Sequence, residues 1–264
     1  MSIEEHLARF IRVLDERGIA TEPLVAVAQA VGLANVFLGV GTLSGRVQML
    51  VPADADAIAI VAPGVALPER SMLLVSGREG EPVTVGIVIG GPTLARAAVD
   101  EVGPEATRLE WLSVIESLVG TNGVIKNRTR YVGAQRGTIT ISFLQRSAAG
   151  HATLGAELTN VASRLGMPGD WRRAFDDGGA GSDVSVTTEC TAAGLVPRIA
   201  LRFGPADFDR AIDLAKASVD EDLARNAAVR MGMLAGGLGV EGARGVEAVF
   251  DQGGTDLVVW LKLG

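Results

Sequence analysis

The sequence contains few of the residues on which several common chemistries depend. It has one cysteine, Cys190, and two histidines, His6 and His151, among its 264 residues. A single cysteine cannot form an intramolecular disulfide, which agrees with a reducing compartment and argues against a cysteine-based metal site. Two histidines argue against a multi-histidine metal centre. We therefore expect no metal ion and no cofactor.

Basic charge and long apolar runs are also lacking. The formal net charge is −7, whereas a protein that neutralises nucleic-acid phosphates needs a basic surface. No uninterrupted apolar run is long enough to cross a bilayer, and the N-terminal residues are acidic where a secretory signal is basic. We expect a soluble, cytoplasmic protein that binds neither nucleic acid nor a membrane.

Motifs of the common hydrolases and nucleotide-binding proteins are absent as well. The chain has no Gly-x-Ser-x-Gly elbow, no His-Glu-x-x-His sequence and no paired cysteine motif. The segment Gly39–Gly45 is rich in glycine, but it lacks the Gly-Lys-Ser/Thr ending of a phosphate loop and leads into a strand pattern. Aromatic residues are few, at 4% of the chain, with a single tyrosine, Tyr131.

The sequence does contain a regular alternation of helical and strand patterns. Apolar residues recur at helical spacing near the N-terminus, within 109–119, within 154–165 and in one long segment that opens at Pro205 and ends near Gly236. Period-two patterns between them predict strands at Val36–Val40, Val47–Val51, Ala57–Val61, Ser71–Ser76, Val83–Ile89, Ile125–Val132, Thr138–Leu144, Val184–Glu189, Leu195–Phe203, Val246–Phe250 and Leu257–Leu263. The length permits one or two domains; the order predicts one domain, 1–264, of repeated α-β-β units.

The two faces of the predicted strands differ in polarity. One face is apolar and suited to packing under helices, while the other carries hydroxyl groups, arginines and one lysine. Two α+β architectures fit this pattern: an antiparallel ten-stranded barrel whose polar face lines a lumen, with helices outside, or an open two-layer α/β sandwich whose polar face meets solvent. In the barrel, the small inner residues Gly39, Gly86 and Ala200 predict room for a ligand.

This order of hairpins and outer helices resembles the ABBA-type aromatic prenyltransferases, also called the PT-barrel family. The resemblance is topological and is strongest from Leu109 to Leu263, including the hairpin of Val124–Tyr131 and Gly137–Phe143. It implies a transferase of natural-product biosynthesis that binds a small molecule in the lumen and moves an isoprenyl group from a diphosphate to an aromatic acceptor.

The resemblance also implies roles for residues on the predicted inner face. Cations that neutralise a leaving diphosphate and a ring that shields an allylic cation are substrate-binding candidates. They are Arg46, Arg128, Arg198, Arg202, Trp260 and Lys262. Glu189 or Glu247 is the catalytic candidate that accepts the proton lost when the acceptor ring regains its aromaticity.

Each of these residues also has a structural interpretation. Arg198 and Arg202 fit a solvated face that pairs with Glu189 across a hairpin, and Arg128 fits a charged sheet edge. The whole chain also fits a non-catalytic binding or adaptor protein of the secretion-chaperone or YbjN-like type, which alternates helices with antiparallel strands. The donor, the acceptor and the oligomeric state are not predicted by the sequence.

Overall fold

The computed structural model describes residues 3–15, 21–32, 35–68, 71–143, 148–167, 171–179, 183–204, 208–238, 245–252 and 254–263. Its helices are α1 (Ile3–Asp15), α2 (Thr21–Val31), α3 (Ala55–Val61), α4 (Ala95–Val102), the short 3-10 helix η2 (Glu105–Thr107), α5 (Arg108–Val119), α6 (Ala148–Arg164), α7 (Trp171–Gly179), α8 (Phe208–Ser218) and α9 (Glu221–Leu238). Its strands are β1 (Phe37–Gly41), β2 (Val47–Pro52), β3 (Ser71–Gly77), β4 (Thr84–Leu94), β5 (Val124–Tyr131), β6 (Arg136–Phe143), β7 (Asp183–Thr191), β8 (Gly194–Leu195), β9 (Arg198–Gly204), β10 (Gly245–Asp251) and β11 (Gly254–Lys262).

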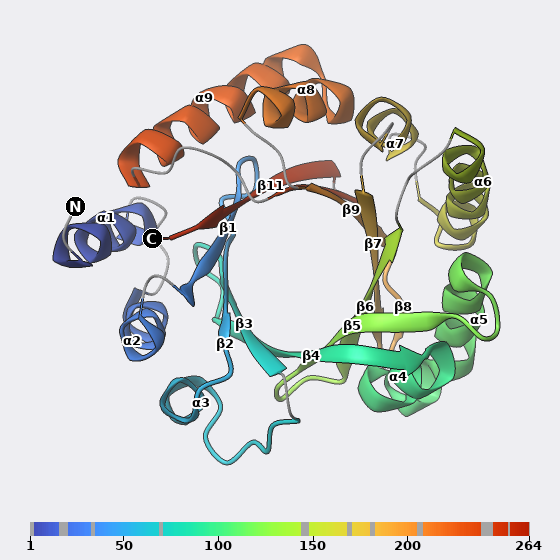
Figure 1. Ribbon diagram of the computed structural model, residues 1–264, viewed down its shortest axis with the longest axis horizontal. Helices are drawn as coiled ribbons and strands as arrows, with labels where there is room; N and C mark the ends of the chain where they lie inside the picture. The colour runs from blue at the N-terminus through green and yellow to red at the C-terminus, as the bar shows by residue number, and fades with distance from the viewer. Residues whose placement is uncertain are drawn as a thin grey trace.

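The strands form one antiparallel sheet that closes on itself (Figure 1). The order is β6-β5-β4-β3-β2-β1-β11-β10-β9-β7-β8, and β6 also pairs with β7. The pairing of β6 with β7 closes the sheet into a ring, and the two-residue β8 pairs with β7 outside this ring. Ten of the eleven strands therefore form the ring. The predicted ten-stranded barrel is confirmed, and the open sandwich is wrong.

Alternation along each strand separates a core beneath the helices from a polar interior. The outward residues of β11, Leu257, Val259 and Leu261, are at most 1% exposed and belong to the main apolar core. Inward residues Val258 and Trp260 belong to a second, smaller apolar cluster inside the ring. The predicted faces of β7, β9 and β11 are therefore confirmed, since a strand exposes successive side chains on opposite sides.

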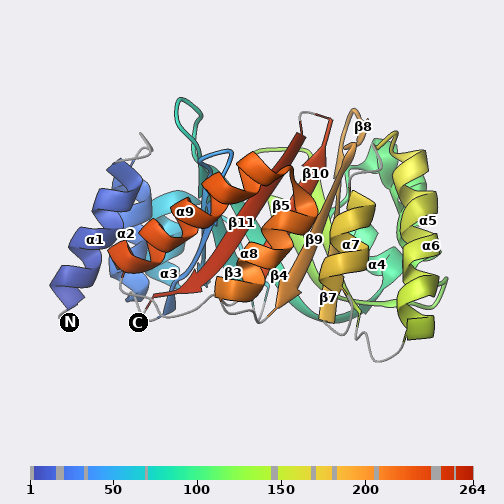
Figure 2. The same cartoon turned by 90° about the horizontal axis from the view of Figure 1, so that it is seen from above.

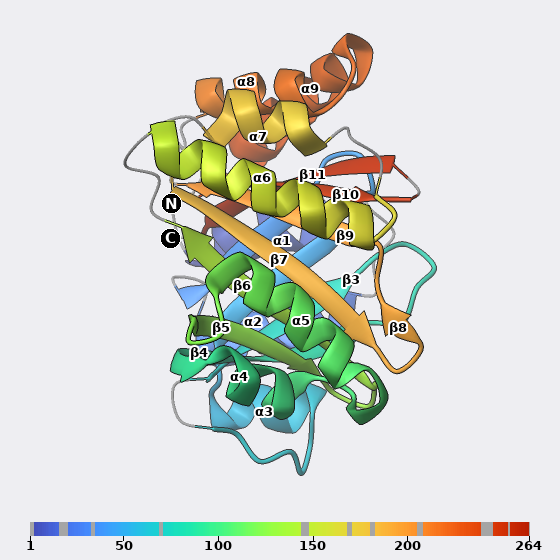
Figure 3. The ribbon, with the colours of Figure 1, turned by 90° about the vertical axis from the view of Figure 1, so that its right-hand side faces the viewer.

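The helices lie outside the ring and cover its outer face (Figures 1 and 3). Helix α4 packs on β4, β5 and β6, α7 on β9 and β10, and α8 on β10 and β11. From α5, the fully buried Trp111 donates its indole N–H to Thr188 of β7 at 3.0 Å. This bond satisfies the polar group of a large buried ring. None of the helices in the described part of the chain is long and apolar enough to span a membrane.

Local structure differs from the sequence prediction in three places. The predicted strand Ala57–Val61 is helix α3, because the carboxylate of Asp54 accepts a hydrogen bond from the Asp56 N–H and caps the first turn. The long helical segment that opens at Pro205 is two helices, α8 and α9. The carboxylate of Asp220, just before α9, accepts a hydrogen bond from the Leu223 N–H and caps its first turn. The predicted strand 195–203 is divided into β8 and β9, and residue 144 of predicted strand 138–144 lies outside the described residues.

All the hairpins turn at one end of the barrel, which we call the hairpin end (Figure 2). It is defined by the turns that follow Gly41, Gly77, Tyr131, Thr191 and Asp251. The helical connections between hairpins begin and end at the opposite end, because successive strands run antiparallel. Residues near these turns on different strands are therefore brought together around one opening.

Candidate functional site

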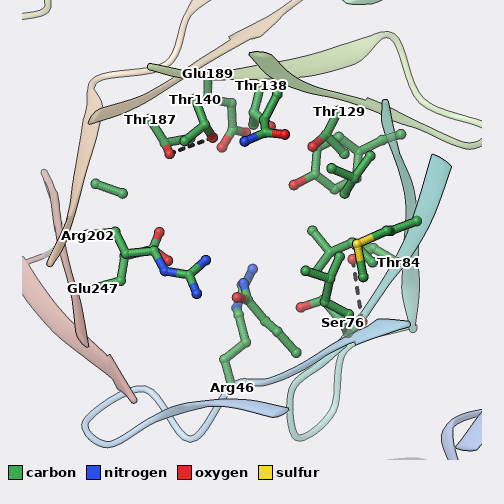
Figure 4. Close-up of a pocket in the computed structure, with 18 of the residues that line it drawn as sticks. Arg46, Ser76, Thr84, Thr129, Thr138, Thr140, Thr187, Glu189, Arg202 and Glu247 are labelled. Carbon is green, nitrogen blue, oxygen red and sulfur yellow. Dashed lines mark hydrogen bonds between the residues drawn. The ribbon is translucent and has the colours of Figure 1, made fainter. Parts of the chain in front are cut away.

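The interior of the barrel holds a cavity of about 330 Å³ whose wall comes mainly from inward-facing strand residues. Four arginines and two glutamates line it, a net charge of +2 in a chain whose total is −7. Its lining residues are Arg46, Gln48, Leu50, Met72, Leu74, Ser76, Thr84, Val88, Asn127, Thr129, Tyr131, Arg136, Thr138, Thr140, Thr187, Glu189, Arg198, Ala200, Arg202, Glu247 and Trp260. Figure 4 draws 18 of these side chains and shows that they point from several strands into the lumen.

Three of the arginines lie toward the hairpin end. Glu189 lies on β7, whose neighbours are β9, which begins at Arg198, and β6, which begins at Arg136. Arg198 Nη1 donates to Glu189 Oε2 at 3.3 Å, and Arg136 Nε lies 2.6 Å from Glu189 Oε1. Arg46 comes from the opposite wall, beside β2, and extends toward the centre of the lumen (Figure 4).

The charges of these arginines interact across the lumen. The pKa of Arg46 is lowered, first by burial and next by the positive charge of Arg198, with Arg136 acting in the same direction. Glu81, 3.5 Å from Arg46 at the tip of the β3–β4 hairpin, partly offsets this repulsion. The hairpin end is therefore a region where an added anion has several positive partners.

Tyr131, the single tyrosine of the chain, lies among these cations. The guanidinium carbon of Arg136 stands 4.2 Å from the centre of its ring. Burial raises the pKa of the Tyr131 phenol above its ordinary value of 10.0, so the ring is neutral near pH 7. The stack gives Arg136 a second attachment besides Glu189.

A second group of side chains surrounds Trp260 on β11. The residues paired with Trp260 on either side are both glycines, Gly39 on β1 and Gly245 on β10. A Cβ atom on Gly39 would lie 3.1 Å from three atoms of the indole, so the ring rests on the Gly39 backbone. Arg202 lies 4.8 Å from the ring centre, and the indole N–H donates to Glu247 at 3.0 Å. These contacts fix the orientation of the indole.

Hydroxyl groups and apolar side chains fill the remaining wall. Thr140 and Thr187 share a hydrogen bond of 2.9 Å between β6 and β7, and Thr84 donates to the Ser76 carbonyl at 3.4 Å (Figure 4). Strands β2, β3 and β4 contribute an apolar part of the wall, across the lumen from Thr140 and Thr187. It consists of Leu50, Met72, Leu74 and Val88. The cavity thus offers an anion-binding end and an apolar surface to the same ligand.

No family model matches the sequence, and no curated protein matches it. Solved structures do match. The apo form of prenyltransferase PriB superposes with a TM-score of 0.62 at 16% identity over 98% of this chain and 95% of that chain. The 5-dimethylallyltryptophan synthase from Streptomyces coelicolor gives 0.53 at 14% identity over 98% of this chain and 96% of that chain. This chain has the PT-barrel fold.

Most of the site residues predicted from the sequence lie together in the lumen of this PT barrel. Arg46, Arg198, Arg202, Glu189, Glu247 and Trp260 all line the cavity. Lys262 shares the inner face of β11 with Trp260, yet it is not part of the cavity wall, because it is the last residue of its strand at the end opposite the hairpin turns. The predicted pair between Arg198 and Glu189 is present as well.

The predicted position of Arg128 is wrong. Arg128 faces outward, where its Nε donates to Glu101 of α4 and Nη1 donates to the Gly91 carbonyl at 3.2 Å. Regular alternation from the buried Ile125 places Arg128 inside, but the pairing of β4 with β5 is irregular between Gly90 and Thr93. The extra residue of this bulge lies on β4, because Gly90 and Thr93 are three residues apart while their partners Asn127 and Ile125 are two apart. Beyond it Asn127, Thr129 and Tyr131 face the cavity.

The cavity wall differs from the sequence prediction at Arg136 and at two of the three small inner residues. Arg136 lines the lumen although it falls between the predicted strands Ile125–Val132 and Thr138–Leu144. Strand β6 begins at Arg136, which shares the inward parity of Thr138 and Thr140. That parity is the signal that could have revealed it. Gly39 leaves room for the Trp260 indole and Gly86 for the Thr129 side chain, whereas Ala200 does border the cavity.

The types of polar side chain in the lumen indicate which class of ligand the cavity suits. Among the described residues, no group of three or more His, Cys, Asp or Glu side chains is placed to hold a metal ion. The polar groups that converge are guanidinium, hydroxyl and two carboxylate groups. This set suits an anionic organic ligand with an apolar part.

Proposed function

We propose that this PT barrel binds an isoprenyl diphosphate in its lumen and transfers the isoprenyl group to an aromatic acceptor. The observation that carries the proposal is the convergence of Arg46 with Arg136 and Arg198 of the facing wall on one end of the barrel cavity. A diphosphate placed there gains charge-assisted hydrogen bonds from several guanidinium groups. The isoprenyl chain then extends along the apolar wall of β2, β3 and β4.

The chemistry assigned to these groups is an electrophilic substitution. The allylic C–O bond breaks, and its electron pair leaves with the diphosphate, whose charge the arginines stabilise. The acceptor ring attacks the allylic carbon, and the new C–C bond makes the ring cationic. Loss of a proton from the attacked ring carbon restores aromaticity. Glu247, held by the Trp260 N–H at 3.0 Å, is the lumenal carboxylate that we assign to receive the proton.

The solved PT barrels support the class of donor and acceptor. One of them is a ternary complex of PriB with L-tryptophan and dimethylallyl thiolodiphosphate, which matches this chain with a TM-score of 0.57 at 16% identity. Another is PriB with product diphosphate, at a TM-score of 0.61. At such identities the likeness establishes a shared fold, so the residues of this lumen must supply the chemistry.

The closed ring weakens the adaptor interpretation. An adaptor of the secretion-chaperone type would expose one face of an open sheet to a partner, whereas the β6–β7 pairing closes this sheet into a ring. The charged side chains expected on a solvated sheet face instead surround a cavity.

The proposal is tested by isothermal titration calorimetry with dimethylallyl and geranyl diphosphate. We expect the wild type to bind them and Arg198→Ala to bind at least about tenfold more weakly, since a charge-assisted hydrogen bond contributes about 1.5–3 kcal/mol. Arg130→Ala is the matched control, because Arg130 is an exposed residue on the opposite face of β5 from the lumen. It should leave binding unchanged.

An acceptor screen by mass spectrometry follows if the donors bind. We expect prenylated product from an aromatic acceptor with the wild type and a large loss of kcat with Glu247→Gln, whose amide cannot take up the proton. Absence of donor binding by the wild type would contradict the proposal.

A further inference from the structure

Glu189 occupies a position that an anionic ligand of the arginines would share. It lies on β7 between Arg198 on one neighbouring strand and Arg136 on the other, and its two oxygens are engaged separately by the two guanidinium groups. Only 7% of the residue is exposed. A buried carboxylate with both oxygens engaged in this way is a counter-ion for the pair.

The counter-ion does not balance the charge of the hairpin end. Three guanidinium groups, from Arg46, Arg136 and Arg198, face one lumenal carboxylate there, with Glu81 at the outer rim. The positive charge of Arg198 acts on Arg46 from across the lumen, lowering its pKa after the larger effect of burial. Arg136 also keeps its stack on Tyr131 at 4.2 Å, so its guanidinium stays at the cavity wall when Glu189 is replaced as its partner.

We propose that Glu189 is a specificity-determining residue, a built-in counter-ion that restricts the lumen to ligands with several negative charges. The inference rests on the proposed function, because it takes the diphosphate group as the ligand. A small anion with two charges must compete with the Glu189 carboxylate for two arginines and is repelled by it. A diphosphate, with more charge and greater length, contacts Arg46 as well as Arg136 and Arg198 and outweighs that repulsion.

This role differs from the proton-acceptor role. Both Glu189 oxygens are engaged by guanidinium groups, so the carboxylate acts on the ligand by its negative charge and by competing for these arginines. Glu247 contacts the Trp260 indole instead. The two lumenal carboxylates therefore have separate tasks, and replacing each by its amide separates them experimentally.

The test compares inorganic pyrophosphate with inorganic sulfate by titration calorimetry, using the wild type, Glu189→Gln and Glu247→Gln. With Glu189→Gln we expect sulfate to bind on the order of tenfold more tightly, the effect of removing one like charge from a partly buried site. Pyrophosphate should gain less, so the ratio of the two affinities should fall. Glu247→Gln removes the same charge from the same cavity and should leave the ratio near that of the wild type.

The outcomes separate this inference from the proposed function. In one outcome the wild type binds pyrophosphate while Glu189→Gln either keeps the same ratio of pyrophosphate to sulfate affinity or binds both anions more weakly. Either result would show that Glu189 only holds the arginines, and the inference would fail while the proposed function stands. If neither the wild type nor Glu189→Gln binds pyrophosphate, both the inference and the proposed function are overturned. Circular dichroism checks folding, and Glu189→Ala replaces Glu189→Gln if that variant does not fold.

Discussion

At the scale of single residues, two glycines without side chains determine how Trp260 packs in the lumen. Gly39 and Gly245 flank Trp260 on the two neighbouring strands, and the absence of a side chain at both lets the indole and the Arg202 guanidinium lie close to the backbone. Burial lowers the pKa of Arg202, and the nearby Glu247 carboxylate opposes that shift. Arg202 covers part of the indole, so Trp260 already contacts a cation of the protein itself.

Gly39→Ala should move the indole into the cavity. The new Cβ would lie 3.1 Å from three ring atoms, and such crowding costs about 1–3 kcal/mol in folding free energy. We expect a loss of stability in urea denaturation and weaker binding of isoprenyl diphosphates. Gly232→Ala, in α9 with open space around the new Cβ, is the control and should be neutral or stabilising. Equal effects of the two substitutions would contradict the packing of Trp260 on Gly39.

Tyr131 allows a direct measurement of burial, because the chain has no other tyrosine. Its pKa is raised above 10.0, chiefly by burial. For an acid whose pKa is higher in the folded state, the stabilising contribution is present below the unfolded pKa and is lost as pH rises through the folded pKa. Absorbance at the phenolate band should therefore show a midpoint above pH 10, with stability falling over the same range.

The matched variant is Tyr131→Phe, which removes the titrating group and keeps the ring. It should abolish the absorbance change and reduce the loss of stability above pH 10. A wild-type midpoint at or below 10 would contradict burial as the dominant effect on this phenol, since the nearby Arg136 charge acts to lower its pKa.

At the scale of elements, strand parity predicted much of the site. In β7, β9 and β11 the alternation is uninterrupted, so Glu189, Arg198 and Trp260 could be placed on the inner face from sequence. The pairing of β4 with β5 is irregular at Gly90-Gly91-Pro92, where a glycine of positive φ and a proline interrupt β4, and the inward face of β5 could not be read from Ile125 alone. The pattern of residues 57–61 fits either a short strand or a helix, and the Asp54 cap decides for the helix.

The corrected position of Arg128 has a stability consequence. Its side chain is 9% exposed and pairs with Glu101 of α4, so Arg128→Ala leaves a partly buried carboxylate without this cation. We expect a loss of about 1–3 kcal/mol in urea denaturation and no change in pyrophosphate affinity. Arg130→Ala, at the next and exposed position, should change stability by less than about 0.5 kcal/mol. A loss of pyrophosphate binding without destabilisation would return Arg128 to the lumen.

At the scale of the whole molecule, closure creates the site by facing distant strands toward one another. Arg46 and Glu189 are far apart in sequence and come from opposite walls of the ring, so no local pattern predicts that they share a cavity. Closure also concentrates positive charge in an acidic protein, because the residues that line the cavity carry a net +2 while the total is −7. An anionic ligand is therefore favoured inside the barrel over its outer surface.

Closure can be tested by hydrogen exchange, since β6 and β7 are edge strands in an open sheet and interior strands in the ring. Eight residue pairs join them, from Arg136 with Thr191 to Phe143 with Val184. We expect the amides of both strands to exchange as slowly as those of β3, which has partners on both sides. The two-residue β8, paired with β7 outside the ring, should exchange sooner. Fast exchange along β6 and β7 would mean that the sheet opens between them, and an open sheet cannot hold Arg46 opposite Arg136 and Arg198 around an enclosed anion.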